Sequence, residues 1–336
     1  MKNPGLWQRV WNRTGLADKT LWDLLQLLIV PLLVVVVANH LNEAANERQR
    51  LETADRHRQE VYNRILSDMS DLILEGGLAE PEAKHSVRAV ARARILTTLQ
   101  EIDPARKRSL ITFLAQSKLI DGMYPVIALN DADLRGVDLS GLYLWGENLV
   151  GADLREANLQ DATLAKAFLM GGDLRDADMR GTRLLHARLT HARLEDADLR
   201  GANLIDADLE NTRLTGAKLK GALYSEKTRF PSGFDPGRHA ALTIAPGSDL
   251  RNARLQEAFL RNVNLSKANL TGANLESAQL QHTDLRGADL SGANLRGAYL
   301  NEADLTGARL EGSDLCGATM PDGSINTRDC RQETLP

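Results

Sequence analysis

The stretch ADLSGANLRGAYLNEADLTGARL (288–310) places a leucine at every fifth position and an alanine two residues before each leucine. A period of five fits neither an α-helix nor a β-strand, whose side chains repeat every 3.6 and every two residues. The stretch therefore predicts a chain that turns after each short extended segment. From every segment one large and one small apolar side chain point inward, and the residues between them face water.

The five-residue step continues through two blocks of the chain. From Leu129 to Leu219 it passes nineteen positions, all leucine except Met179, and from Leu250 to Leu315 it passes fourteen, all leucine. Leu219 and Leu250 are 31 residues apart, so the interruption shifts the step by one residue. Gly, Asn, Asp and Ser recur at one phase of the step, which supplies turn chemistry at every corner.

This pattern resembles the pentapeptide repeat family, whose motif is A(D/N)LXX. The matching segments are ADLRG (132–136), ADLRE (152–156), ANLQD (157–161), ADLRG (197–201), ANLTG (268–272) and ADLSG (288–292). The resemblance implies a mainly β fold, a right-handed quadrilateral β-helix with four pentapeptides per coil. Stacked at the sheet spacing, such coils would form a rod about 40 Å long.

The repeat and its interruption divide the C-terminal part of the chain. We expect a first repeat block at 125–222, a non-repeat loop at 223–248, a second block at 249–320 and a tail at 321–336. The interruption is either an extruded loop on a continuous stack, which we favour, or a break between two stacked β-helices. In either case Phe230 and Phe234 would cover the side or end of the rod.

The N-terminal residues 1–41 predict an interfacial segment followed by a single transmembrane helix. Leu24 to Leu41 are eighteen residues without a charge. A helix from Thr20 to Leu41 would be about 33 Å long, enough to cross a bilayer. Trp22 would lie at the headgroup level. A buried core helix and a cleaved signal peptide are the alternatives.

Residues 42–124 predict a helical stalk and a helical hairpin. The apolar spacing from Leu51 to Leu72 indicates an amphipathic helix that could form a homodimer, and Asp103–Pro104 is typical of a helix start. The basic residues of this region are expected mainly on solvated faces, with contact to anionic lipid or an acidic partner as the alternative. They are Arg88, Arg92, Arg94, Arg106, Lys107 and Arg108.

The two cysteines and the flanking charges bear on the cellular compartment. Cys316 and Cys330 either form a disulfide that staples the last coil in an oxidising compartment, or are two free thiols. The basic residues around the apolar stretch favour slightly a repeat domain outside the cytoplasm of a single-pass membrane protein.

No catalytic, cofactor-binding or metal-binding residue can be singled out. The sequence has no H-E-x-x-H, G-x-x-x-x-G-K-[ST] or G-x-S-x-G motif. His186 and His191 are predicted on adjacent outer faces, and the aspartates before the leucines belong to the repeat itself. Glu147 and Gly172 occupy small inward positions and depart from the motif, as does Tyr299 at an outward position.

These features predict a non-enzymatic, membrane-tethered scaffold or protein-interaction module with an unidentified protein partner and no cofactor. The alternative that the resemblance implies is a DNA-mimicking regulator of a type II topoisomerase. A mimic needs a sustained negative potential. Residues 129–220 hold sixteen acidic and twelve basic side chains, and residues 249–315 hold nine and seven. The near balance argues against the mimic and against nucleic-acid binding.

Overall fold

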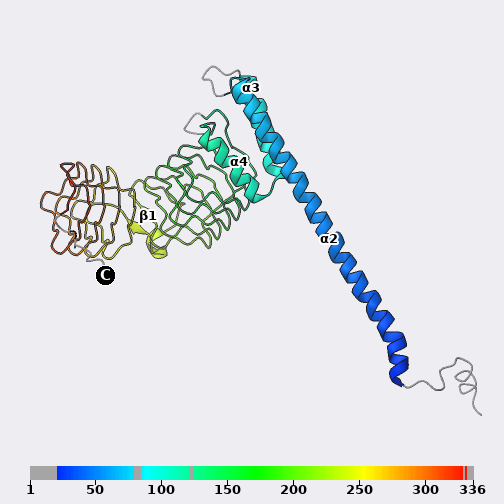
Figure 1. Ribbon diagram of the computed structural model, residues 1–336. Coiled ribbons are helices and arrows are strands. Elements are labelled where there is room, and N and C mark those ends of the chain that lie inside the picture. Colours follow the sequence, from blue (N-terminus) through cyan, green and yellow to red (C-terminus); the bar gives the residue numbers. More distant parts are fainter. Residues whose placement is uncertain (1–20, 79–84, 121–124, 328–329, 331–336) are drawn as a thin grey trace, which may run out of the picture. The chain divides into compact units, whose positions relative to one another are not determined.

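The computed structural model describes residues 21–78, 85–120, 125–327 and 330, and the side chains of the first helix from Val30 onward except Pro31. The elements are α2 Leu21–Leu74, α3 His85–Glu101, α4 Pro104–Gln116, β1 Leu223–Tyr224, the 3₁₀ helix η1 Pro236–His239 and β2 Leu242–Thr243. The chain forms two compact units, Met1–Glu60 and Val61–Pro336. Figure 1 shows the elements within each unit.

Most of the second unit is a stack of four-sided coils. Backbone bridges join residues twenty apart in parallel, as in Asp133 to Asp153 to Asp173, so every fourth pentapeptide lies on the same side. Leu134 N–H donates to the carbonyl of Asp153 at 2.8 Å, and Asp153 N–H donates to the carbonyl of Ala132 at 3.0 Å. The β-helix with four pentapeptides per coil, which the resemblance to the pentapeptide repeat family implied, is therefore confirmed.

Each corner of a coil is a turn whose geometry explains the polar residues of the motif. Ala132 N–H donates to the carbonyl of Leu129 at 3.2 Å, and Asp131 between them has a φ of +60°. The aspartate or asparagine before each leucine caps the next corner, as where Asp138 Oδ1 accepts the N–H of Ser140 at 3.0 Å. These aspartates form the turns that the repeat needs, as the sequence predicts.

His191 tests the left-handed corner. Its φ is +61° and its side chain is exposed. We expect His191→Gly to leave the free energy of unfolding unchanged or slightly higher, because glycine adopts this conformation without steric cost. His191→Val should lower it by about 1–2 kcal/mol, because the left-handed region is strained for a β-branched residue. Thermal unfolding of the two variants checks this, and equal melting temperatures would contradict the corner geometry.

The inside of the stack is dry and consists mainly of leucine and alanine. Leu204 and Ala202 are fully buried, as are most of their equivalents in other coils. Burying each leucine contributes about 1.5–3 kcal/mol. Thr182 replaces an alanine, and its hydroxyl donates to the carbonyl of Leu159 at 2.8 Å. Glu147 is also fully buried at an inward position, so the stack accepts a carboxylate where the motif has alanine.

Helices close the N-terminal end of the stack. Asp103 accepts the N–H groups of Ala105 and Arg106, and Pro104 opens α4, so the predicted helix start is confirmed. The buried face of α4, with Leu110 and Leu114, shares one core with Leu129 and Leu134 of the first coil. Residues from α3 and from the last turns of α2 belong to the same core. The helices therefore cover an end that would otherwise expose the leucine core.

The interruption does not leave a continuous stack, and the preference for an extruded loop is wrong. Asn203 pairs with Leu223 and Leu223 with Leu242, so the interruption adds an irregular coil to the first stack. In the described chain, no backbone hydrogen bond joins residues 249–268 to residues 129–243. The second block begins its own ladder at Asp249 and has its own core.

Aromatic residues of the interruption cap the first stack. Phe230 and Phe234 pack on its core, as predicted for the end of a rod, and their rings stack at 5.3 Å. His239 stacks on Phe234 at 4.7 Å, and Tyr224 meets Phe230 edge to face. Because this cluster occupies the end of the first stack, the second block cannot continue its ladder and starts a separate stack.

The C-terminal tail folds back on the last coil. Thr319 pairs antiparallel with Ile325, and Asn326 N–H donates to the carbonyl of Ala318 at 2.8 Å. Cys316 and Cys330 form a disulfide, the alternative that staples the last coil.

Removing this disulfide should loosen the tail and leave the stacks intact. Closing a loop of about fifteen residues contributes about 3 kcal/mol in the chain-entropy model. We expect Cys316→Ser/Cys330→Ser to speed amide exchange at Gly317 and Asn326, whose N–H groups bond between tail and coil. The amide of Leu204, in the first stack, serves as the control. Unchanged exchange at both tail amides would show that the disulfide does not hold this contact.

The predicted division at residues 41 and 42 is not an element boundary, because α2 runs unbroken from Leu21 to Leu74. The expected transmembrane helix is not found: within the described residues, no helix has the length and apolarity to cross a membrane. The interfacial segment, and the side chains before Val30 in the expected span, lie outside the described residues. From Val30 the described apolar side chains of α2 are exposed, between 49% and 66% up to Leu41.

Candidate interaction surfaces

The outward positions of the stacks form columns of charged side chains that are largely paired within the protein. Asp173 and Arg175 meet at 2.7 Å, Asp178 and Arg180 at 2.6 Å. The same pair of positions repeats one coil later, where Asp198 and Arg200 meet at 2.6 Å. Each arginine follows its aspartate by two residues, so the motif A-D-L-R builds the pair locally. The acidic flanks are thereby neutralised, as the balanced composition indicates.

These pairs make the stacks sensitive to acid. Hydrogen bonds from Arg175 and Arg180 hold the pKa of Asp173 and Asp178 below the usual value, and Arg251 lowers the pKa of Asp249 to about 2. A carboxylate with a depressed pKa stabilises the folded state above its unfolded pKa of about 4, and the contribution disappears as pH falls further. We expect a constant melting temperature from pH 7 to about 5 and a decline below about 4, with a shallower decline in Asp173→Asn.

Several basic residues of the helical region bind the first coil of the β-helix, so the prediction of solvated faces is wrong for them. Lys107 is 4% exposed, and its Nζ lies 3.0 Å from Asp133. Arg108 meets Asp138 at 3.0 Å, and Arg92 donates to the carbonyl of Asn130 at 2.8 Å. Contact with an acidic partner was the alternative predicted for these basic residues. The acidic groups that Lys107 and Arg108 contact belong to the first coil of the same chain. Arg94 and Arg106 pair within the helical region, with Asp68 and Asp103.

The two histidines lie on different sides of the coil, as predicted, and are not brought together. His186 Nδ1 lies 3.6 Å from Asp206 of the next coil, and both histidines occupy left-handed corners. Within the described part of the chain, no group of three or more His, Cys, Asp or Glu side chains is placed to hold a metal ion.

The contact between the two stacks is formed by residues that the sequence analysis missed. Leu185 and Ile205 follow the core leucines and point outward, where the repeat usually has a polar residue, yet they pack with the core of the second stack. Asn203 Nδ2 donates to the carbonyl of Phe259 at 3.0 Å, and the Arg183 guanidinium lies over the Phe259 ring. The sequence did contain a signal for this contact, namely two apolar residues, Leu185 and Ile205, at outward positions twenty residues apart. Residues twenty apart lie on the same side of adjacent coils, so the two side chains form one apolar surface.

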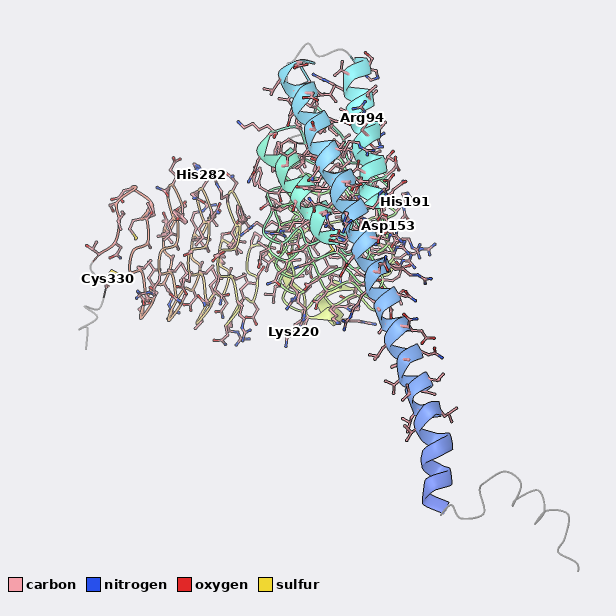
Figure 2. The ribbon with its side chains drawn as sticks, turned by 45° about the vertical axis from the view of Figure 1, so that its right-hand side comes forward. Arg94, Asp153, His191, Lys220, His282 and Cys330 are labelled. Atoms are coloured by element: carbon pink, nitrogen blue, oxygen red, sulfur yellow. A yellow bond between two sulfur atoms is a disulfide. The ribbon has the colours of Figure 1, made fainter. Side chains whose placement is uncertain are left out.

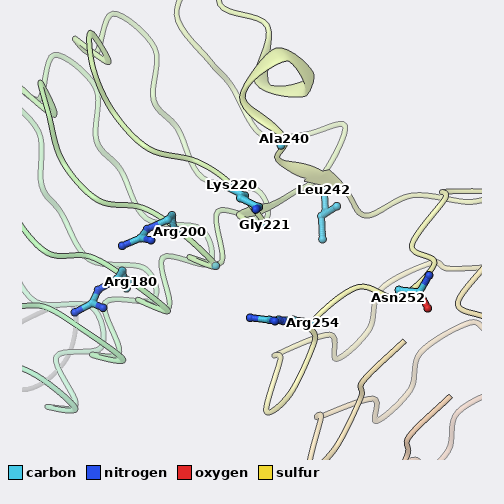
Figure 3. A pocket seen from close by; sticks show the side chains of 9 residues that line it. Arg180, Arg200, Lys220, Gly221, Ala240, Leu242, Asn252 and Arg254 are labelled. Atoms are coloured by element: carbon cyan, nitrogen blue, oxygen red, sulfur yellow. The ribbon is translucent and has the colours of Figure 1, made fainter. Parts of the chain in front are cut away.

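Beside this contact lies an open groove of about 600 Å³. Its basic residues come from both stacks, as Figure 3 shows: Arg180, Arg200 and Lys220 from the first and Arg254 from the second. Figure 2 shows Lys220 at the surface of the protein. Elsewhere on the surface, Tyr143 and Tyr299 are 63% and 45% exposed. Tyr299 is therefore outward as predicted.

The family model of pentapeptide repeats matches in eight copies, over residues 132–169, 157–196, 183–221, 248–287 and 283–320. These ranges are the two stacks described above, and they leave out the helical region and the centre of the interruption. No curated protein matches the chain.

Solved pentapeptide repeat proteins also resemble the chain. HetL, involved in heterocyst differentiation regulation in the cyanobacterium Nostoc sp. strain PCC 7120, is 34% identical, over 64% of this chain and 98% of its own, with a TM-score of 0.21. Rfr23 from the cyanobacterium Cyanothece 51142 is 35% identical over 28% of this chain, with a TM-score of 0.28, and the match spans 64% of its length. QnrB1, a plasmid-mediated fluoroquinolone resistance protein, is 16% identical over 52% of this chain and 84% of its own, with a TM-score of 0.25.

Proposed function

Because the chain belongs to the pentapeptide repeat family, we propose that it is a non-catalytic protein-interaction module that presents its stacked coils to a protein partner. The observation that carries this proposal is the difference between the inward and the outward positions of each coil. Inward positions are leucine and a small residue in most pentapeptides, with Met179 and Glu147 among the exceptions. Outward positions form columns whose charge and size vary from coil to coil. Such surfaces suit recognition by many side chains together.

A photo-crosslinking experiment tests this proposal. A photoreactive amino acid at Tyr299, or at Arg251 on another side of the second stack, should link the full chain in cells to a defined protein partner. The same amino acid at buried Leu275 is the control and should give no product. The proposal fails if outward and buried positions give the same products.

We further propose that the N-terminal part of α2 tethers the module to a membrane in a single pass. The support is the uncharged sequence from Leu24 to Leu41 and the exposure of its described apolar side chains, such as Leu33 and Val36. Burial of such side chains in lipid removes apolar surface from water.

Membrane fractionation tests the tether. We expect the full chain to stay with membranes after alkaline carbonate extraction, and Leu33→Asp/Val36→Asp to release it, because charges at the centre of a span are costly. Gln49→Asp, beyond the apolar stretch, should not release the chain. Quantitative extraction of the unaltered chain would contradict the tether.

The repeat domain is proposed to lie outside the cytoplasm. The disulfide between Cys316 and Cys330 supports an oxidising compartment, and the basic residues around the apolar stretch favour the same side. In intact cells, an impermeant maleimide should label Cys330 only after an impermeant reductant is added. Labelling that requires cell lysis would place the domain in the cytoplasm.

A topoisomerase regulator that mimics DNA is less well supported. The aspartates of the flanks are paired with arginines, as in Asp178 with Arg180 and Asp284 with Arg286, so the surface lacks the sustained negative potential of a duplex. A supercoiling assay with the detergent-solubilised full chain should show no inhibition of a type II topoisomerase at micromolar concentration.

Homodimerisation through the helix from Leu51 to Leu72 is tested by light scattering of the same preparation.

A further inference from the structure

The basic residues of the groove between the stacks form an ordered array. Arg180 follows the core residue Met179, while Arg200 and Lys220 follow Leu199 and Leu219. The three basic residues are twenty residues apart, so they occupy the same position in three successive coils. Coils stack at about 4.8 Å, which places the three backbones in a straight column at that spacing. Arg254 extends into the groove from the first coil of the second stack (Figure 3).

The positive charge of this array is only partly neutralised. Asp178 and Asp198 pair with Arg180 and Arg200, but the next coil has Lys218 where the column would place an aspartate. Across the described residues, neither Lys220 nor Arg254 has an ion-pair partner. The end of the groove at the second stack therefore carries more positive than negative charge, unlike the paired flanks of the coils.

The floor of the groove is apolar. It consists of Gly201, Gly221, Ala240 and Leu242, and the N–H of Gly221 donates to the carbonyl of Ala240 at 2.8 Å. Because glycine has no side chain, nothing projects into the groove at Gly201 and Gly221. Basic residues along the sides and an apolar floor favour a ligand that has acidic and apolar groups on opposite sides. An extended peptide has this arrangement when the two kinds of residue alternate.

We propose that this groove binds an extended, acidic segment of a protein partner, in which acidic and apolar residues alternate. The inference rests on the proposed function and names the chemistry of the partner. Acidic side chains would contact Lys220, Arg254 and the outer part of the arginine column, while apolar side chains would lie on Leu242. No aromatic side chain lines the groove as described, whereas surfaces for single-stranded nucleic acid usually offer aromatic rings for base stacking.

Fluorescence anisotropy with the purified full chain tests this inference. The probe is a labelled peptide of alternating glutamate and leucine, and the reference peptide has lysine in place of glutamate. We expect saturable binding of the acidic probe that weakens as salt is raised, and no binding of the lysine peptide. Lys220→Gln/Arg254→Gln should weaken binding of the acidic probe about tenfold or more, because both side chains contact the probe directly.

Arg286→Gln/Arg296→Gln is the matched control, because it removes the same net charge from the second stack away from the groove. It should leave the affinity unchanged within about twofold. The melting temperatures of both double variants should match that of the unaltered chain. If a double variant melts at a lower temperature, the affinity of Lys220→Glu for the acidic probe provides a second test. Equal affinity for a single-stranded oligonucleotide, or equal loss in the two double variants, overturns the inference.

The crosslinking experiment separates failure of this inference from failure of the proposed function. If Lys220→Gln/Arg254→Gln loses the probe peptide but keeps every crosslinked partner, the groove is not the partner's site while the interaction module stands. If neither outward position crosslinks a partner, the proposed function fails, whatever the peptide result.

Discussion

Leu204→Asp should unfold the first stack. Leu204 is fully buried in the middle of this stack, and its N–H donates to the carbonyl of Leu223 at 2.7 Å. Truncation of such a leucine to alanine costs about 2–5 kcal/mol, and an unpaired carboxylate in a dry core costs more. The cost is comparable to the whole stability of a domain, about 5–15 kcal/mol. We expect loss of the β-type circular dichroism signal and of the cooperative thermal transition.

Thr190→Asp is the matched control for this substitution. Thr190 follows the core leucine of a neighbouring side and points outward, so the new carboxylate remains in water. Its circular dichroism spectrum should be unchanged, with a melting temperature within a few degrees of the unaltered chain. If Leu204→Asp melted like Thr190→Asp, the inward assignment of the leucines would be wrong.

Lys107→Ala should have the second-largest effect, by weakening the helical cap of the first stack. The Lys107 side chain is 5% exposed and its Nζ lies 3.0 Å from Asp133 Oδ1. Burial alone would raise the pKa of Asp133, but hydrogen bonds from Arg135 and Lys107 outweigh it and hold the pKa far below its usual value. Removing one partner of a buried pair costs about 3–5 kcal/mol, because the other charge loses its compensation. Chemical denaturation measures the change.

A double-mutant cycle separates the ion pair from simple packing. Lys107→Ala/Asp133→Asn should lose less stability than the sum of the two single changes, because the remaining charge is removed as well. Arg108→Ala is the matched control on the same helix. Its pair with Asp138 is about half exposed and should contribute less than about 1 kcal/mol. Equal losses for Lys107→Ala and Arg108→Ala would show that burial of the Lys107 pair adds nothing.

The inward and outward positions of each pentapeptide could be predicted from the sequence because they follow from local rules, whereas the four-sided coil was implied by the family resemblance. A leucine at every fifth position, an alanine two residues before each leucine and a turn residue between a leucine and the next alanine specify each corner independently of distant parts of the chain. The aspartates were also correctly interpreted, since each one bonds to the residue two positions on, as Asp138 does with Ser140. Local hydrogen bonds of this kind are visible in a single pentapeptide.

Contacts between distant segments could not be predicted in the same way. Lys107 lies in α4 and Asp133 lies in the first coil of the β-helix, so the sequence around either residue does not indicate that the two pair. The break between the stacks depends on how Phe230 and Phe234 pack on the end of a coil. The groove combines Lys220 and Arg254, which only this break brings together. The groove was therefore not predicted for the same reason as the break between the stacks, because both depend on contacts between distant segments of the chain.

Because each coil has twenty residues and the core repeats every five, the core and the surface columns respond differently when pentapeptides are deleted or inserted. Deleting one pentapeptide from the first stack would keep every leucine in phase and leave the core intact. It would, however, turn all later residues by one side, so a deletion between Arg200 and Lys220 would remove Lys220 from the column of Arg180 and Arg200. Deleting four pentapeptides would shorten the stack and restore the columns. Insertions and deletions in this chain can therefore reassign its surface by quarter turns while its interior stays the same.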